Sequence, residues 1–237
     1  MHVLREALAW LFTAANWWGP AGILARLWEH LQMTGEVLAI ALALAVPVGL
    51  LVGHKGKGGF LAVNAAGVGR AIPSFGVLAF VFPFAIRYLP GNIGLWPTLI
   101  ALVVLAVPPM LTNTYVAIRG VDPDIVEAAR GTGMGELQVL TKVELPLAAP
   151  LMLDTLRVVA VQVVATATLG AEVGWGGLGR FIVDSLSIND APHLLAGALL
   201  VAALALVVDL AFASLARGLA PPPRPKRFGL ARARSVG

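Results

Sequence analysis

The sequence predicts an all-α, polytopic membrane protein with about five transmembrane helices. Of its 237 residues, 58% are apolar and only 13% are charged, whereas about a quarter of the residues in soluble domains are charged. The apolar residues also form charge-free runs long enough to cross a hydrocarbon core about 30 Å thick. We expect helices because lipid offers no partner for an unpaired backbone group, and because the runs lack the polar and apolar alternation of barrel strands.

Five apolar runs predict the spans, at about 35–53, 71–89, 95–117, 148–171 and 194–215. Together they make a transmembrane domain of residues 35–217. A turn at Leu89-Pro90-Gly91-Asn92 separates the second span from the third. The fourth run contains Asp154 and Arg157, whose spacing predicts an ion pair on one helix face. The last run contains Asp209, for which we expect a partner of unknown identity inside the bundle.

The distribution of Lys and Arg predicts the orientation of the chain. These residues gather beside the central charged stretch and near the C-terminus, so the positive-inside rule places both regions in the cytoplasm and the N-terminus outside. Residues 1–34 are predicted to be an external amphipathic segment, with Trp17 and Trp18 at the membrane interface. A signal peptide is the alternative, but Arg5 is followed at once by Glu6. Residues 218–237 are predicted to be a disordered basic cytoplasmic tail.

The stretch between the third and fourth spans, residues 119–146, is longer than a connector requires. Asp122-Pro123 predicts a helix start, because Asp caps free amides and Pro suits the first helical position. Gly131 and Gly133 predict its end. A second short helix, at about 135–144, is expected to stop at Leu145-Pro146. The stretch is therefore predicted to be two short cytoplasmic helices joined by a glycine turn.

Residues in this stretch follow a spaced pattern: Glu127-Ala128-Ala129, then Gly133, Val143 and Leu145-Pro146. The pattern resembles the EAA loop of ABC importer permeases, with Val143 where Ile is usual. Further stretches between about 16 and 217 resemble the osmoprotectant branch of these permeases, which takes betaine, choline and carnitine. They are Trp28-Glu29-His30-Leu31, Ala71-Ile72-Pro73-Ser74, Asn113-Thr114-Tyr115, Gly120-Val121-Asp122-Pro123, Lys142-Val143-Glu144-Leu145-Pro146 and Thr166-Ala167-Thr168-Leu169-Gly170.

The resemblance implies the type I ABC importer permease fold and a multi-pass protein of the prokaryotic plasma (inner) membrane. It implies a transport subunit, not an enzyme, that imports small quaternary-ammonium solutes such as glycine betaine, choline or carnitine. The implied partners are a cytoplasmic ABC ATPase that holds ATP and Mg, an external substrate-binding protein, and a second permease subunit, identical or related. We expect no cofactor on this chain and no nucleic acid. The implied ATPase-coupling residues are Glu127, Ala128, Ala129, Gly133, Val143, Leu145 and Pro146.

Several other residues are candidates for the substrate path or its gate: Pro73, Ser74, Asn113, Thr114, Thr166, Thr168, Gly176 and Gly177. Interhelical hydrogen bonding is the alternative role of the polar ones. The stretch 174–179 matches GxGxxG but follows a membrane helix, so a dinucleotide site is excluded. It resembles the family's glycine loop, and is either a flexible outer loop or part of a gate. No cluster has metal-ligand spacing, and His54 beside Lys55 is interpreted as solvated charge.

Two alternative functions stay open. One is the permease of another ABC import branch, methionine-like or phosphonate-like, because these share the EAA loop and the glycine loop. The other is a self-contained secondary transporter, which needs an ion or proton relay inside the spans. Only Asp154, Arg157 and Asp209 are candidates for such a relay, and none lies at the centre of a span.

Overall fold

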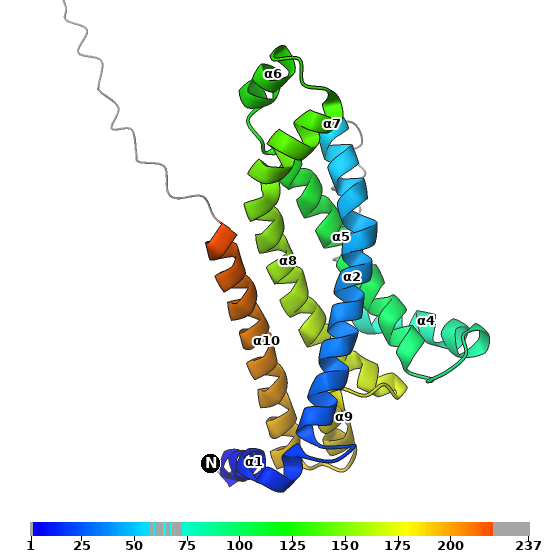
Figure 1. Cartoon of the computed structure of the whole chain (residues 1–237). Coiled ribbons are helices and arrows are strands. Elements are labelled where there is room, and N and C mark those ends of the chain that lie inside the picture. Colours follow the sequence, from blue (N-terminus) through cyan, green and yellow to red (C-terminus); the bar gives the residue numbers. More distant parts are fainter. Residues whose placement is uncertain (1, 57–58, 60–63, 65–66, 68–72, 220–237) are drawn as a thin grey trace, which may run out of the picture.

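The structure is a computed structural model that describes all residues except 1, 57–58, 60–63, 65–66, 68–72 and 220–237 (Figure 1). Every regular element within the described residues is helical, which confirms the predicted all-α class. The elements are α1 (His2–Phe12), η1 (Ala14–Trp17), α2 (Ile23–Lys55), α4 (Ser74–Tyr88), α5 (Leu95–Arg119), α6 (Pro123–Gly131), α7 (Glu136–Val139), η2 (Leu140–Glu144), α8 (Leu145–Ala167), η3 (Thr168–Val173), α9 (Gly179–Ser187) and α10 (Ala191–Leu219).

Four of the described helical segments are long and apolar enough to cross a membrane: Ile23–Lys55, Leu95–Arg119, Glu136–Val173 and Ala191–Ala216. The remaining expected span, at 71–89, corresponds to α4, which has 15 residues. The first two residues of that expected span, 71 and 72, lie outside the described residues. The structure thus has four full-length candidate spans and one shorter apolar helix where about five spans were expected.

The first span is longer than the sequence pattern indicated. We expected it to begin near 35, but α2 begins at Ile23 and runs for 33 residues. The stretch 23–34 therefore belongs to the same helix as the first expected span, and the boundary expected at 34 falls inside α2. The reason is packing: Ile23, Met33 and Val37 are buried along one side of α2, so the core stabilises the helix well before the charge-free run starts.

The central segment, residues 119–146, begins as predicted. Asp122 Oδ1 accepts a hydrogen bond from the amide of Asp124 at 3.0 Å, and Pro123 stands in the first turn of α6. Gly133 has a φ of +87°, which favours glycine and lets the chain turn after α6.

The second helix does not stop at Leu145-Pro146, as the sequence suggested, but continues into α8. Residues Leu140–Glu144 form a π-helical turn, and the amide of Leu145 bonds back to the carbonyl of Leu140. The π turn changes the hydrogen-bond spacing just before Pro146, which has no amide proton to donate. The chain therefore passes from the central segment into the third full-length span without a break.

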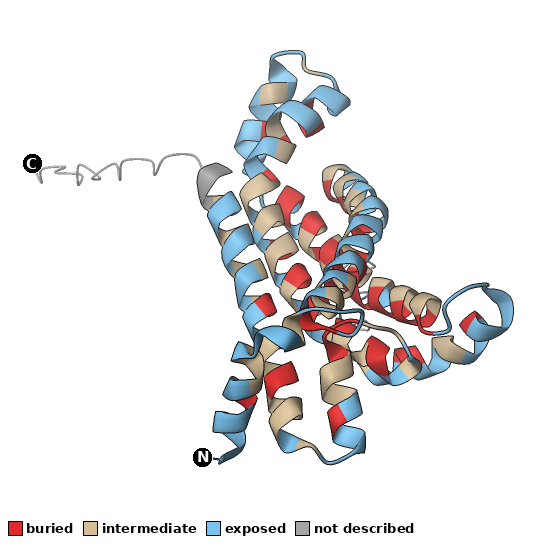
Figure 2. Ribbon diagram, turned by 60° about the horizontal axis from the view of Figure 1, so that its bottom comes forward, coloured by how far each residue is buried: buried red, intermediate tan, exposed pale blue. Residues whose placement is uncertain are grey.

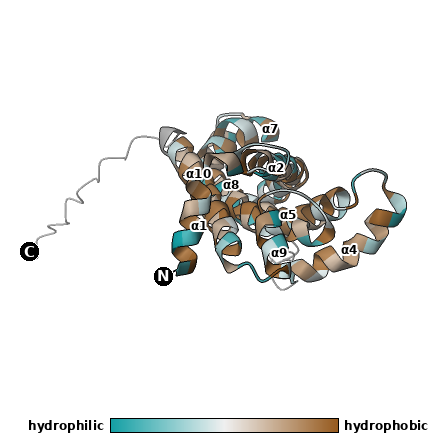
Figure 3. Ribbon diagram, turned by 90° about the horizontal axis from the view of Figure 1, so that it is seen from below, coloured by the Kyte–Doolittle hydropathy of each residue, from teal (hydrophilic) through white to brown (hydrophobic). Residues whose placement is uncertain are grey.

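The core of the bundle forms where α2, α5 and α8 meet. Buried residues lie on their facing sides and the outer sides are exposed (Figure 2). Gly49 and Gly53 of α2 lie against Thr114 and Ile118 of α5, so the two backbones approach closely, as small residues allow in membranes. The long helices consist largely of hydrophobic residues (Figure 3). Several of these are exposed, including Leu44 and Val207, which suits helices surrounded by lipid.

Candidate functional site

Two parts of the fold contain most of the predicted site residues. The central segment lies at one end of the helix bundle, and the loop 174–178 lies near the opposite end, between η3 and α9 (Figure 1). The long helices α2, α5 and α8 run between these two ends. A change at one end can therefore reach the other through only a few packed helices.

The central segment is a small packed unit with one outward face. Val126 is buried and Ala129 is half-buried, and both pack in a cluster with Ile118, Val139 and Leu140. Glu127 and Ala128 are exposed on the other side of α6. The turn at Gly133 is exposed too, and the space around its Cα is open.

The remaining predicted coupling residues lie where η2 passes into α8. Val143 and Leu145 are half-buried and Pro146 is exposed. Leu137 of α7 is 72% exposed, which is unusual for a leucine next to a packed cluster. The seven predicted coupling residues thus lie in one compact unit, although no single contact joins them all.

His54 was missed by the sequence analysis, which interpreted it as solvated charge. Its side chain is only 9% exposed and lies between two carboxylates. Nδ1 is 2.6 Å from Glu144 Oε2, and Nε2 is 2.9 Å from Glu136 Oε2. Glu136 in turn accepts two hydrogen bonds from Arg130, at 2.9 and 3.1 Å. This chain of contacts ties the end of α2 to the central segment. The spacing of Glu136 and Glu144, about two helical turns, was the signal that could have revealed it.

A cavity of about 340 Å³ opens between α2, α5 and α8, in the half of the bundle nearer the central segment. Its lining is apolar except for Thr114 and Thr155, whose hydroxyl groups donate to Met110 and Leu151 on their own helices. Thr114 is thus a predicted path residue that does line a cavity. Asn113, its neighbour, is half-buried and is not among the lining residues. The residues that line the cavity are Leu42, Val46, Met110, Thr114, Leu145, Ala149, Met152, Leu153, Thr155 and Leu156.

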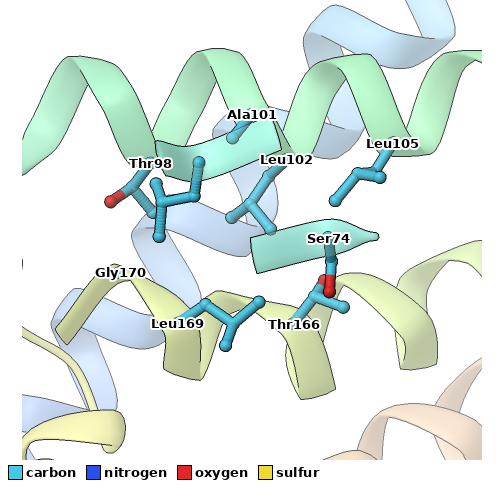
Figure 4. A pocket seen from close by; sticks show the side chains of 9 residues that line it. Ser74, Thr98, Ala101, Leu102, Leu105, Thr166, Leu169 and Gly170 are labelled. Carbon is cyan, nitrogen blue, oxygen red and sulfur yellow. The ribbon is translucent and has the colours of Figure 1, made fainter. Parts of the chain in front are cut away.

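A second, very small space of about 10 Å³ brings together two predicted path residues, Ser74 and Thr166 (Figure 4). Thr98 lines the same space, and the sequence analysis did not single it out. The space holds about one water molecule, so it is too small for a solute. Thr166 donates to the carbonyl group of Gln162 in its own helix, and Thr168, the first residue of η3, donates to that of Ala165 in the last turn of α8. Pro73 is exposed and immediately precedes α4.

The loop 174–178 is held against α2. Gly177 has a φ of +78°, and its amide donates to Glu29 Oε2 at 2.7 Å. A side chain at Gly176 would collide with the same carboxylate. The two predicted loop residues, Gly176 and Gly177, thus both lie against α2.

The charged residues inside the spans pair differently from the sequence prediction. Arg157 does not hydrogen-bond to Asp154. Its guanidinium donates two hydrogen bonds to Asp209 of α10, at 2.6 and 2.7 Å. The planar fork of Arg matches both oxygens of a carboxylate when the two helices lie side by side, whereas a neighbour on the same helix is reached less well. Among the described residues, no group of three or more His, Asp or Glu side chains could hold a metal ion.

Comparison with known proteins identifies a family that this chain matches. Residues 45–221 match the family described as "Binding-protein-dependent transport system inner membrane component". Among curated proteins, the chain is 36% identical to the carnitine transport permease protein OpuCB of Listeria monocytogenes, over 84% of this chain and 88% of the relative. It is 32% identical to the choline transport system permease protein OpuBB of Bacillus subtilis (strain 168), over 84% of this chain and 89% of the relative.

Solved structures share the fold. A chain from an inward-facing structure of the MetNI methionine ABC transporter superposes with a TM-score of 0.76 and 24% sequence identity. The match covers 84% of this chain and 96% of that one. The helices therefore follow the arrangement of an ABC importer permease.

Proposed function

The chain belongs to the family of binding-protein-dependent transport system inner membrane components, and on that premise we propose that it is the permease subunit of an osmoprotectant importer. The expected substrates are small quaternary-ammonium solutes such as glycine betaine, choline and carnitine. One observation carries this proposal: the curated relatives that match most of the chain at 30–36% identity are named as carnitine, choline and glycine betaine permeases. ATP hydrolysis belongs to a partner ATPase, and an external binding protein supplies affinity for the solute.

The contacts support a mechanism in which the central segment binds the ATPase and passes its movement to the long helices. The outward face of the central segment, with Glu127, Ala128 and Leu137, is the surface we assign to the ATPase. The contacts of His54 with Glu136 and Glu144 join that surface to α2, while the unbroken helix from Glu136 to Val173 joins it to α8. Movement of the ATPase is then transmitted to two of the three helices that line the 340 Å³ cavity.

A permease of the methionine branch is the second candidate, because solved methionine transporter chains have the same fold. The sequence favours the first candidate: identity to the carnitine permease is 36%, whereas identity to the methionine transporter chain is 24%. The secondary-transporter alternative loses its support. Arg157 and Asp209 satisfy each other, which leaves only Asp154 of the three relay candidates outside that pair.

The test is uptake by the complete importer. The chain is co-expressed with the ATPase and binding protein encoded beside it, and the complex is reconstituted in liposomes. We expect ATP-dependent uptake of labelled glycine betaine, choline or carnitine, and none of methionine. Uptake of methionine alone would assign the chain to the other branch. Uptake by the chain without ATPase or ATP would contradict both ABC assignments.

A further inference from the structure

Two adjacent residues of α2 hold the loop 174–178. The amide of Gly177 donates to Glu29 Oε2 at 2.7 Å, and the amide of Leu178 donates to His30 Nδ1 at 3.3 Å. Arg26 donates to the same Glu29 oxygen at 2.9 Å and so fixes the carboxylate in place. The loop is thus tied to α2 by two consecutive backbone amides and two consecutive side chains.

His30 also reaches a third element. It is 1% exposed, and its Nε2 lies 2.9 Å from the carbonyl oxygen of Val164, in the last turn of α8. A carbonyl oxygen only accepts, so Nε2 must carry the hydrogen, while Nδ1 must be bare to accept from Leu178. The neutral ring with its proton on Nε2 satisfies both contacts at once. His30 therefore bridges α8 and the loop, and each of its ring nitrogens serves one of them.

The glycines of the loop make this approach possible. A Cβ at Gly176 would overlap the Glu29 carboxylate, and a Cβ at Gly177 would lie 3.1 Å from His30 Nδ1. Gly177 also has a φ of +78°, which side chains other than glycine rarely adopt. The glycine-rich composition is thus explained by close contact with Glu29 and His30, and does not indicate a freely moving loop.

The opposite half of the bundle is built differently. There, α2, α5 and α8 separate enough to leave the cavity of about 340 Å³. At the loop end, α2, α8 and the loop are joined by polar contacts. These contacts can break and re-form when that end opens to water, because water then replaces the lost partners and the net free energy of each hydrogen bond is small.

We propose that Glu29 and His30 form a clasp that holds loop 174–178 closed at the end of the permease opposite the central segment, and that the clasp opens in the ATP-bound importer so that solute can enter there. Glu29 and His30 are positioning residues, since they act through the loop. The proposal rests on the proposed function, because alternating access requires that end to open.

The test measures how readily a thiol reagent reaches position 171, which is buried next to the loop. Ala171 is 2% exposed, and its carbonyl accepts hydrogen bonds from Gly174 and Arg180 at the two ends of the loop. The natural sequence contains no cysteine, so Ala171→Cys gives a single reactive thiol. Its rate of labelling by a maleimide is measured in the permease–ATPase complex in nanodiscs, with and without a non-hydrolysable ATP analogue. No transported solute is needed.

Matched variants separate the two contacts of His30. In His30→Gln the amide nitrogen can take the place of Nε2 and donate to Val164, but no acceptor remains at the place of Nδ1 for Leu178. In His30→Asn the amide oxygen can take the place of Nδ1 and accept from Leu178, but the shorter side chain does not reach Val164. We expect Glu29→Ala and His30→Gln to raise the labelling rate about tenfold, which corresponds to about 1.4 kcal/mol. His30→Asn should stay close to the parent rate. The ATP analogue should raise labelling of the parent and add little in Glu29→Ala. ATPase co-purification checks that each variant is folded, and Glu29→Leu, which also has no acceptor for the Gly177 amide, replaces any Glu29→Ala protein that is not.

Equal labelling of the Ala171→Cys thiol in the parent, Glu29→Ala and His30→Gln backgrounds would refute the clasp, whatever the importer transports. A rise in His30→Asn equal to that in His30→Gln would refute it too, because the variant that keeps the acceptor for Leu178 would then behave like the variant that loses it. Failure of the parent to take up any osmoprotectant would instead refute the substrate assignment, and would leave the labelling result intact.

Discussion

His54 shows how one side chain links a span to the central segment. Its ring lies between Glu144, which is itself 5% exposed, and Glu136, which is exposed to solvent and also pairs with Arg130. Loss of the imidazole would leave the Glu144 carboxylate buried without this partner. Such an unsatisfied group costs more than the hydrogen bond itself contributes.

His54→Gln is therefore expected to destabilise the protein by about 1–3 kcal/mol and to weaken ATPase co-purification. Thermal unfolding in detergent and pull-down of the ATPase measure the two effects. Lys55→Gln, at the exposed neighbouring position, is the control and should change neither. In a double-mutant cycle, Glu144→Gln should cost less when His54 is already Gln. Strictly additive losses would show that the two side chains do not act together.

The pairing of Arg157 gives a second prediction at the residue scale. Asp209→Asn removes the negative charge and one of the two oxygens that accept from the guanidinium, so we expect a lower thermal midpoint. Asp154→Asn is the matched control, because it changes a carboxylate on the same helix three residues before Arg157. It should leave the midpoint near that of the parent. A lower midpoint for Asp154→Asn than for Asp209→Asn would instead support the Asp154–Arg157 pair expected from the sequence.

At the scale of elements, the central segment is a helix, a glycine turn and a second helix that continues into a span. The glycine turn sets the shape of the outward face of the segment. Gly133 has a φ of +87° and open space around it, so a side chain there would strain the backbone without colliding with a neighbour. A change at Gly133 thus alters the angle between α6 and α7 and leaves the spans intact.

Gly133→Val should lower ATPase association or transport-linked ATP hydrolysis, while membrane insertion stays normal because it depends on the apolar spans. The strain is expected to be about 1–3 kcal/mol. Gly131→Ala is the control, since Gly131 lies in α6 without a positive φ and Ala favours helix. Glu127→Lys reverses an exposed charge on the same face and should also weaken association. Normal association and hydrolysis in both Gly133→Val and Glu127→Lys would contradict the coupling role.

At the scale of the whole molecule, the central segment and loop 174–178 lie at opposite ends of the bundle (Figure 1). From the charge distribution we expect the first end in the cytoplasm and the second outside. Gly135 and Ile93 are both exposed and belong to the two different ends, and the absence of cysteine leaves no background for labelling.

Cysteine at Ile93 should therefore react with a membrane-impermeant thiol reagent in intact cells, and cysteine at Gly135 should not. After the cells are made permeable, both should react, which controls for the reactivity of each site. Reaction at Gly135 with protection at Ile93 in intact cells would invert the topology.

Features that depend on neighbours in the chain were determined by the sequence itself. Apolar runs predicted the helical class and most of the spans, because hydropathy and length suffice for crossing a membrane. The cap at Asp122 and the turn at Gly133 were predicted as well, since each depends on a few adjacent residues. The spaced pattern from Glu127 to Pro146 indicated the family that the comparisons confirm.

Only the tertiary structure decided which distant residues meet. His54 and Glu144 are 90 residues apart, Arg157 and Asp209 are 52 apart, and Glu29 and Gly177 are 148 apart. No local pattern gives such pairs, because they depend on how whole helices pack and which faces they present. Packing also explains why α2 begins as early as Ile23 and why the second helix continues through a π turn past Pro146. Only the second of these went against a local signal to stop, at Leu145-Pro146.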